Sequence, residues 1–257
     1  MPFETDPNVH GGWETDVGCQ FMSGRGHCRI MGAPVFRSCS IPEDDEGNLF
    51  AREWDVPWHA HLVPICLAAI IIGIWLALPV QLLMQSWALS WSPERSLQIP
   101  SLVLHIFAHG GLAHVGMNVA ALLLLSAPLI SRLGTPPISW IRYLYLFAGS
   151  GLSGAILFLI IHREAASMLG ASGAIFGLLG ALARVHPLTG EAVPIRSPRT
   201  WSLVKVFAQN HLALFALLSV FALLAGTTTF VAWEAHLGGL LFGFFATPLY
   251  LPRGQRA

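Results

Sequence analysis

The stretch GASGAIFG, residues 170–177, begins an apolar helical segment and decides how the rest of the chain is interpreted. It places a hydroxyl group, that of Ser172, inside hydrophobic sequence. A histidine, His236, lies in a second apolar segment, AHLGGLLFG, at residues 235–243. Polar and ionisable groups at membrane depth are costly and by default functional. We therefore interpret Ser172 and His236 as a candidate reactive pair.

The composition is that of a membrane protein. Of the 257 residues, 54% are hydrophobic and only 11% are charged, whereas a soluble domain carries about 25% charged residues. The net charge is zero and Lys205 is the one lysine, so bulk charge favours neither nucleic acid nor an acidic substrate.

Hydropathy predicts an all-α membrane protein with six transmembrane helices. A span needs about 20 apolar residues, and the fourth is short, so its first turn should face protein or water below the membrane surface. The long connection at 85–112 contains Trp87 and Trp91 and is expected to be partly embedded at the interface. The predicted spans are 62–84, 113–133, 140–161, 171–185, 209–228 and 233–251.

The first 57 residues are polar and are expected to form a separate, poorly ordered cytoplasmic region, with the membrane domain at 58–257. They resemble neither a secretory signal nor an Arg-rich transit peptide, and their acidic run at 43–46 is interpreted as a solvated linker. The region could bind a partner. Zinc at its cysteines and histidines is the weaker alternative, because their spacing matches no Cys-x-x-Cys pattern. These residues are Cys19, Cys28, Cys39, His10 and His27.

Charge counting predicts a cytoplasmic N-terminus, because positive residues then gather on the inside. Only Arg95 and Arg163 fall outside. The inside residues are Arg25, Arg29, Arg37, Arg52, Arg132, Arg142, Arg184, Arg196, Arg199, Lys205, Arg253 and Arg256. In this orientation the second, fourth and sixth spans run in the same direction, and their polar clusters meet near the outer surface. A multi-pass protein of the bacterial inner (plasma) membrane fits the short loops and the lack of a transit peptide, and an organellar or archaeal membrane is the alternative.

The candidate chemistry is nucleophilic. Ser172 opens a helix, whose first N–H groups lack partners and can stabilise an oxyanion. Serine needs a nearby base, and His236 is the natural one. Glu234 stands two residues before His236, on a different side of the helix, so a surface or capping role is preferred to a triad. The alternatives are that Ser172 is a small packing residue and that His236 is a structural hydrogen bonder or a proton relay.

Small residues repeat every four positions in both spans, at Gly173, Gly177 and Ala181 and at Ala235, Gly239 and Gly243. Such stripes allow close approach of two helix backbones, which would bring Ser172 and His236 together.

His114 and Asn118 share one helical face, and both side chains can donate hydrogen bonds to an oxyanion. Metal binding by His105, His109 and His114 is a weak alternative, because no nearby carboxylate or cysteine completes a site. His105 and His109 are more simply hydrogen-bonding residues of the embedded loop.

These residues together resemble the rhomboid family of intramembrane serine proteases. Three pieces match in order, His109-x-x-x-x-His114-x-x-x-Asn118, Gly170-Ala171-Ser172-Gly173 and Ala235-His236-Leu237-Gly238-Gly239, within residues 60–250. The Trp-Arg pair that many members carry in the first outer loop is absent, and Trp91 and Arg95 are the nearest residues.

The resemblance implies a six-helix rhomboid-like bundle that cleaves transmembrane segments of other membrane proteins without a metal or cofactor. Ser172 would be the nucleophile and His236 the general base. His114, Asn118 and the Ser172 N–H would form the oxyanion hole. Gly170, Gly173, Phe176 and His109 would support the site, with Phe176 against the catalytic histidine.

Two other classes remain open. A rhomboid-like pseudoprotease would bind membrane helices without cutting them, and only the protease would react with a serine-directed fluorophosphonate. A proton-coupled transporter would use the intramembrane histidines, but the chain shows neither inverted repeats nor a carboxylate at mid-depth.

Overall fold

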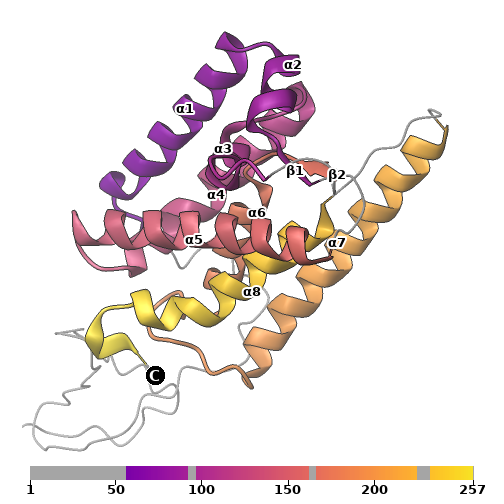
Figure 1. Ribbon diagram of the computed structural model, residues 1–257. Helices are drawn as coiled ribbons and strands as arrows, with labels where there is room; N and C mark the ends of the chain where they lie inside the picture. The colour runs from indigo at the N-terminus through magenta and orange to yellow at the C-terminus, as the bar shows by residue number, and fades with distance from the viewer. Residues whose placement is uncertain (1–55, 92–96, 162–165, 225–231, 257) are drawn as a thin grey trace, which may run out of the picture. The chain divides into compact units, whose positions relative to one another are not determined.

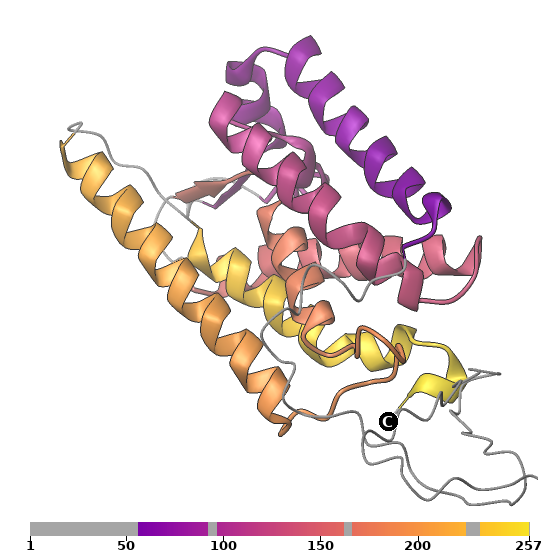
Figure 2. The ribbon, with the colours of Figure 1, turned by 180° about the vertical axis from the view of Figure 1, so that it is seen from behind.

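The computed structural model describes residues 56–91, 97–161, 166–224 and 232–256. The expected N-terminal region and its candidate zinc ligands lie almost wholly outside these residues, as do Arg95 and Arg163. The described part is mostly helical (Figures 1 and 2). Three of its helical segments are long and apolar enough to cross a membrane, Trp58–Ala77, Leu112–Arg132 and Ile138–Ile161, and α6 is a shorter apolar helix.

Four helices closely match the expected spans. They are α4 (Leu112–Arg132), α5 (Ile138–Ile161), α6 (Ser172–Leu182) and α8 (Trp233–Tyr250). In sequence, α6 follows Gly170, whose φ is +114°, and Gly134, with φ +109°, separates α4 from α5. Because glycine adopts positive φ at little cost, each of these two glycines allows the chain to turn next to a helix end.

The first span is shorter than expected. α1 (Leu62–Ala77) ends just before Pro79, and a short α2 (Val80–Leu82) and a π-turn, η3 (Leu83–Trp87), follow. The predicted range 62–84 thus contains α1 and then these short elements, because proline lacks the N–H that would continue the helix and disfavours helix at the residue before it.

The helix of the fifth expected span, α7 (Pro198–Leu224), begins eleven residues before the expected start at 209. Pro198 suits a first helical position, and the Ser197 hydroxyl accepts the Thr200 N–H at 3.1 Å, which caps the helix. Hydropathy marks where the apolar run begins, whereas the cap marks where the helix begins.

The prediction of an all-helical chain misses one small sheet. β1 (Leu89–Trp91) pairs antiparallel with β2 (Ala166–Met168). It joins the connection after α1 to the segment before α6, and α3 (Ser101–Leu104) and η4 (His105–Phe107) follow in the first connection. Backbone polar groups in such connections need partners, and the two short strands supply them to each other.

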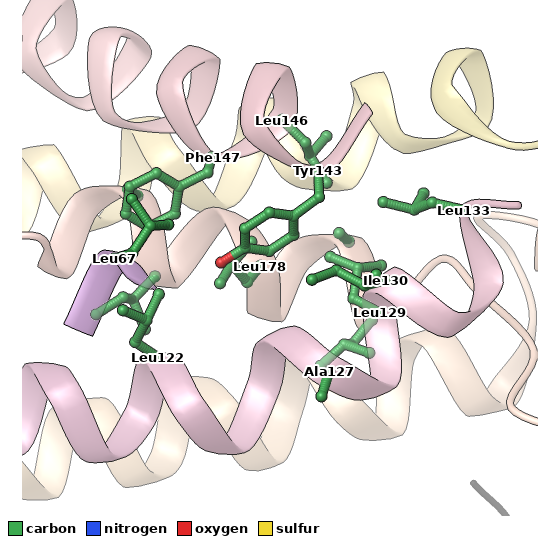
Figure 3. Close-up of a cluster of buried hydrophobic side chains, with 14 of the residues drawn as sticks. Leu67, Leu122, Ala127, Leu129, Ile130, Leu133, Tyr143, Leu146, Phe147 and Leu178 are labelled. Carbon is green, nitrogen blue, oxygen red and sulfur yellow. The ribbon is translucent and has the colours of Figure 1, made fainter. Parts of the chain in front are cut away.

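The core surrounds α6, which is almost wholly buried and packs on α4, α5 and α8 (Figures 1 and 2). Figure 3 shows Leu67, Leu122, Tyr143 and Leu178 converging from α1, α4, α5 and α6. The Tyr143 hydroxyl is satisfied within this core, 2.7 Å from the Ser126 hydroxyl. The helix that carries Ser172 is therefore held on several sides.

Candidate functional site

Ser172 is the first residue of α6, and the turn before it is fixed by the segment that precedes α4. The Gly170 N–H donates to the His105 carbonyl at 2.8 Å. A side chain at Gly170 would put a Cβ 2.6 Å from His114 Nε2, in addition to the strain of its positive φ. Glycine is thus required there both by backbone conformation and by the histidine ring beside it.

Ser172 and His236 meet in the structure. His236 lies in the first turn of α8, and its Nε2 is 2.8 Å from Ser172 Oγ. With Nε2 unprotonated, the hydroxyl donates to the imidazole, which is the arrangement a nucleophile and its base require. Both side chains are only partly buried, so the pair is accessible.

Phe176 lies one turn after Ser172 and stacks on the imidazole. The centroids of the Phe176 and His236 rings are 4.1 Å apart, and the rings are inclined by only 8°. A flat contact at this distance restricts rotation of the histidine ring about its side-chain bonds. The ring plane is therefore set from α6, the helix that carries the hydroxyl.

Parallel packing of α6 and α8 produces the meeting of the two side chains. A Cβ at Gly239 would overlap the Gly173 carbonyl oxygen, and one at Gly243 would overlap the Gly177 carbonyl oxygen. Successive glycines of α8 thus contact successive turns of α6, so the helices run in the same direction in close backbone contact, as small residues permit.

α5 supports this crossing, a role that sequence reasoning missed. The Ser153 hydroxyl donates to the Gly238 carbonyl at 3.0 Å. A Cβ at Gly154 would lie 2.6 Å from the Ala235 carbonyl oxygen, next to His236. The signal was present as the run GSGLSG at 149–154, a set of small residues in the third span.

His114 and Asn118 lie on α4 beside the same turn. Besides its approach to Gly170, the His114 ring contacts the His109 ring at a centroid distance of 5.0 Å. The Asn118 amide donates one N–H to the His114 carbonyl at 2.8 Å, while its Oδ1 is buried without a hydrogen-bond partner among the described residues. The second N–H of that amide is left to serve another acceptor.

His109 supports the turn that precedes the serine. Its Nε2 accepts the Ala171 N–H at 3.4 Å, and its Nδ1 lies 3.3 Å from the Phe107 carbonyl oxygen. One neutral tautomer, with the proton on Nδ1, satisfies both contacts. Burial, with a smaller effect of His114, lowers the pKa of His109 to about 4, so this residue is neutral at physiological pH.

Two further residues that the sequence analysis considered, His105 and Glu234, are both buried. His105 is buried and its Nδ1 lies 2.9 Å from the Ser101 carbonyl oxygen. Glu234 is only 2% exposed and lies in the first turn of α8, so of the two expected roles, surface or capping, the surface role is excluded. A carboxylate there is favourable to the helix dipole. Within the described residues no group of three or more His, Cys, Asp or Glu could hold a metal ion.

The comparisons with known proteins agree on one family. The Rhomboid domain matches residues 96–253, which is more than half of the chain. The chain is 32% identical over 152 residues to RHOMBOID-like protein 1 of Arabidopsis thaliana, a match that covers 58% of this chain and 34% of that protein. It is 30% identical over 155 residues to RHOMBOID-like protein 5 of the same plant, covering 60% and 45% of the two chains.

A bacterial relative is similar over more of its own length. The protein named "Putative rhomboid protease YdcA" from Bacillus subtilis (strain 168) is 28% identical over 156 residues, covering 60% of this chain and 69% of its own. The chain spans less than half the length of the two plant relatives. The matched region contains the three motifs and the helices that carry them, and this chain is a membrane protein of the rhomboid family.

Proposed function

We propose that the protein is an intramembrane serine endopeptidase that cleaves transmembrane segments of other membrane proteins. The observation that carries the proposal is the 2.8 Å contact between Ser172 Oγ and His236 Nε2 at the starts of two parallel helices. The family membership and the name of the bacterial relative support protease chemistry. The proposal includes six spans, residues 58–257 as the membrane domain, and a cytoplasmic N-terminal region in a bacterial inner membrane.

The proposed reaction begins with attack of Ser172 Oγ on the scissile carbonyl carbon. The hydroxyl proton passes to His236 Nε2, and the carbonyl oxygen becomes an oxyanion. His236 then gives the proton to the leaving amine, which leaves an acyl-enzyme. Water, deprotonated by His236, attacks the ester and restores the serine. The dyad needs no metal or cofactor.

The oxyanion would be stabilised by the Ser172 N–H and by donors from α4. The first N–H groups of α6 have no partner within the helix, and His114 lies beside the Gly170 turn. The remaining N–H of Asn118 is the third donor. Preorganised donors of this kind contribute about 3–4 kcal/mol each to transition-state stabilisation.

The substrate must present an extended backbone to Ser172, because a helical peptide has its carbonyls engaged and its scissile bonds covered. Transmembrane segments that unwind readily near the outer surface, with small residues at the cut, fit this requirement. Four supporting residues would keep the Ser172 and His236 side chains in position while such a segment enters. They are Gly170, Gly173, Phe176 and His109.

The test is cleavage of a transmembrane substrate in liposomes by the wild type and by Ser172→Ala and His236→Ala. Both variants should lose cleavage and labelling by a fluorophosphonate, while keeping the thermal unfolding midpoint of the wild type. Ser131→Ala is the matched control, because the Ser131 hydroxyl donates to the Pro128 carbonyl within its own helix, away from the Ser172–His236 pair. Cleavage that persists in Ser172→Ala would exclude this serine. An unlabelled, inactive wild type would favour a helix-binding pseudoprotease.

A further inference from the structure

Positive charge gathers at the end of the helices opposite the Ser172–His236 pair. Every Lys and Arg of the described residues lies at or just after the end of α4, α6 or α8, or near the start of α5 or α7. Among the same residues Glu191 is the one carboxylate at this end, since Glu234 lies at the start of α8. Exposed cations here include Arg196, Arg253 and Arg256.

These cations lie on two segments that are joined by hydrogen bonds. The Ala192 N–H donates to the Gln255 carbonyl at 2.8 Å, which ties the α6–α7 connection to the turn η5 (Arg253–Gln255) after α8. Arg184 donates from Nε to the Val193 carbonyl at 2.8 Å and fixes that connection to the end of α6. The arginines of the two segments therefore form one surface, and ordering it upon binding has little further entropic cost.

The same surface exposes apolar side chains. In and just after the α6–α7 connection, Leu188, Ile195 and Trp201 are 45%, 40% and 57% exposed. Tryptophan favours the boundary between lipid and water. Arg132 is the last residue of an apolar helix long enough to cross a membrane. This end therefore lies where phospholipid headgroups are, with arginine and apolar side chains next to one another.

From this juxtaposition we propose that the surface formed by the α6–α7 connection and η5 binds anionic phospholipid headgroups. Arg196, Arg253 and Arg256 contact the phosphates, and Leu188, Ile195 and Trp201 enter the glycerol and upper acyl region. A lipid surface fits better than a soluble acidic protein, because the exposed apolar side chains need an apolar environment that a water-soluble acidic segment does not supply. The inference is independent of the proteolytic activity.

The experiment uses the full chain in neutral detergent micelles and follows its thermal unfolding midpoint as phosphatidylglycerol is added. The midpoint should rise with the anionic lipid, and salt should weaken the effect. Each arginine contributes about fivefold to the apparent affinity, so the combined variant Arg196→Gln, Arg253→Gln, Arg256→Gln should bind about a hundredfold more weakly. The matching triple lysine variant keeps the charge and should retain most of the affinity.

Three controls decide the source of the effect. Phosphatidylcholine and inorganic phosphate should each leave the midpoint nearly unchanged, and Leu188→Ser with Ile195→Ser should weaken the response to lipid. Equal responses of the wild type and the glutamine variant would overturn the proposal. An equal rise with inorganic phosphate would show a site for a free anion, and an equal rise with phosphatidylcholine would show an apolar effect only. Either outcome would also overturn it.

Discussion

Gly154→Ala tests whether α5 sets the position of the histidine. A Cβ at residue 154 would lie 2.6 Å from the Ala235 carbonyl oxygen and 3.3 Å from its carbonyl carbon and Cα. Real Cβ contacts are seldom shorter than 3.0–3.4 Å, so α5 and α8 must separate by roughly 0.4–0.8 Å, the difference from 2.6 Å. The three Ala235 atoms belong to helix backbone and an alanine methyl group has no rotamers, so a side-chain rotation cannot relieve the overlap.

The shift acts on the residue next to His236. If α8 carries the displacement, the 2.8 Å contact between Ser172 Oγ and His236 Nε2 stretches toward the limit of a hydrogen bond. A misplacement of about 1 Å can reduce the rate about a hundredfold, so we expect Gly154→Ala to lower kcat by about ten- to a hundredfold. Overpacking should lower the unfolding free energy by about 1–3 kcal/mol.

The assay is cleavage of a transmembrane substrate in liposomes, measured well below the unfolding midpoint of the variant, together with fluorophosphonate labelling. Gly73→Ala is the control. Its Cβ would meet nothing within 4 Å, and replacing a glycine inside a helix should raise stability by about 0.5–1 kcal/mol. If Gly154→Ala cleaves and labels as well as Gly73→Ala does, α5 does not position His236 and the reasoning fails.

Two further predictions concern the ring contacts around the site. Phe176→Leu removes the flat contact with the imidazole and should lower kcat several-fold with little change in KM, whereas Phe176→Tyr should retain activity; equal kcat values for the two variants would contradict a positioning role. His109→Gln keeps an acceptor for the Ala171 N–H but cannot titrate. Because the pKa of His109, before the start of α4, is about 4 in the fold against an ordinary 6.5, the unfolded chain binds the extra proton between these values. The free energy of unfolding should therefore fall by ~3 kcal/mol as the pH is lowered through that window. Unfolding midpoints measured across the window should be flatter for His109→Gln, and identical profiles for variant and wild type would exclude His109 as the titrating group.

The sequence predicts helices well where their ends carry strong local signals. The α6 start follows from Gly170, and the end of α4 precedes Gly134, because few other residues adopt those backbone angles. The α7 start was missed because the Ser197 cap and Pro198 lie in polar sequence that hydropathy ignores. The strands β1 and β2 were missed because three-residue segments have no measurable periodicity.

The pairing of two side chains 64 residues apart is harder to predict, yet two patterns pointed to it. Charge counting placed the spans of Ser172 and His236 in the same direction, and the glycine stripes indicated close packing between them. Neither pattern specified the third helix at the crossing. Gly154 and Ser153 act through contacts with the backbone of α8, and such contacts leave only a run of small residues in the sequence, which is also typical of ordinary membrane helices.

The position of the site depends on backbone contacts more than on side-chain contacts, and this limits which substitutions it can accept. Along the crossing the glycines bring main-chain atoms of α5, α6 and α8 into direct contact, so no rotamer change can absorb an added methyl group. The preceding turn is held by the main-chain carbonyl of residue 105, which accepts the Gly170 N–H, and by the His109 ring, which accepts the Ala171 N–H. The position of Ser172 is thus fixed by two parts of the structure, the helix that it begins and the loop before α4.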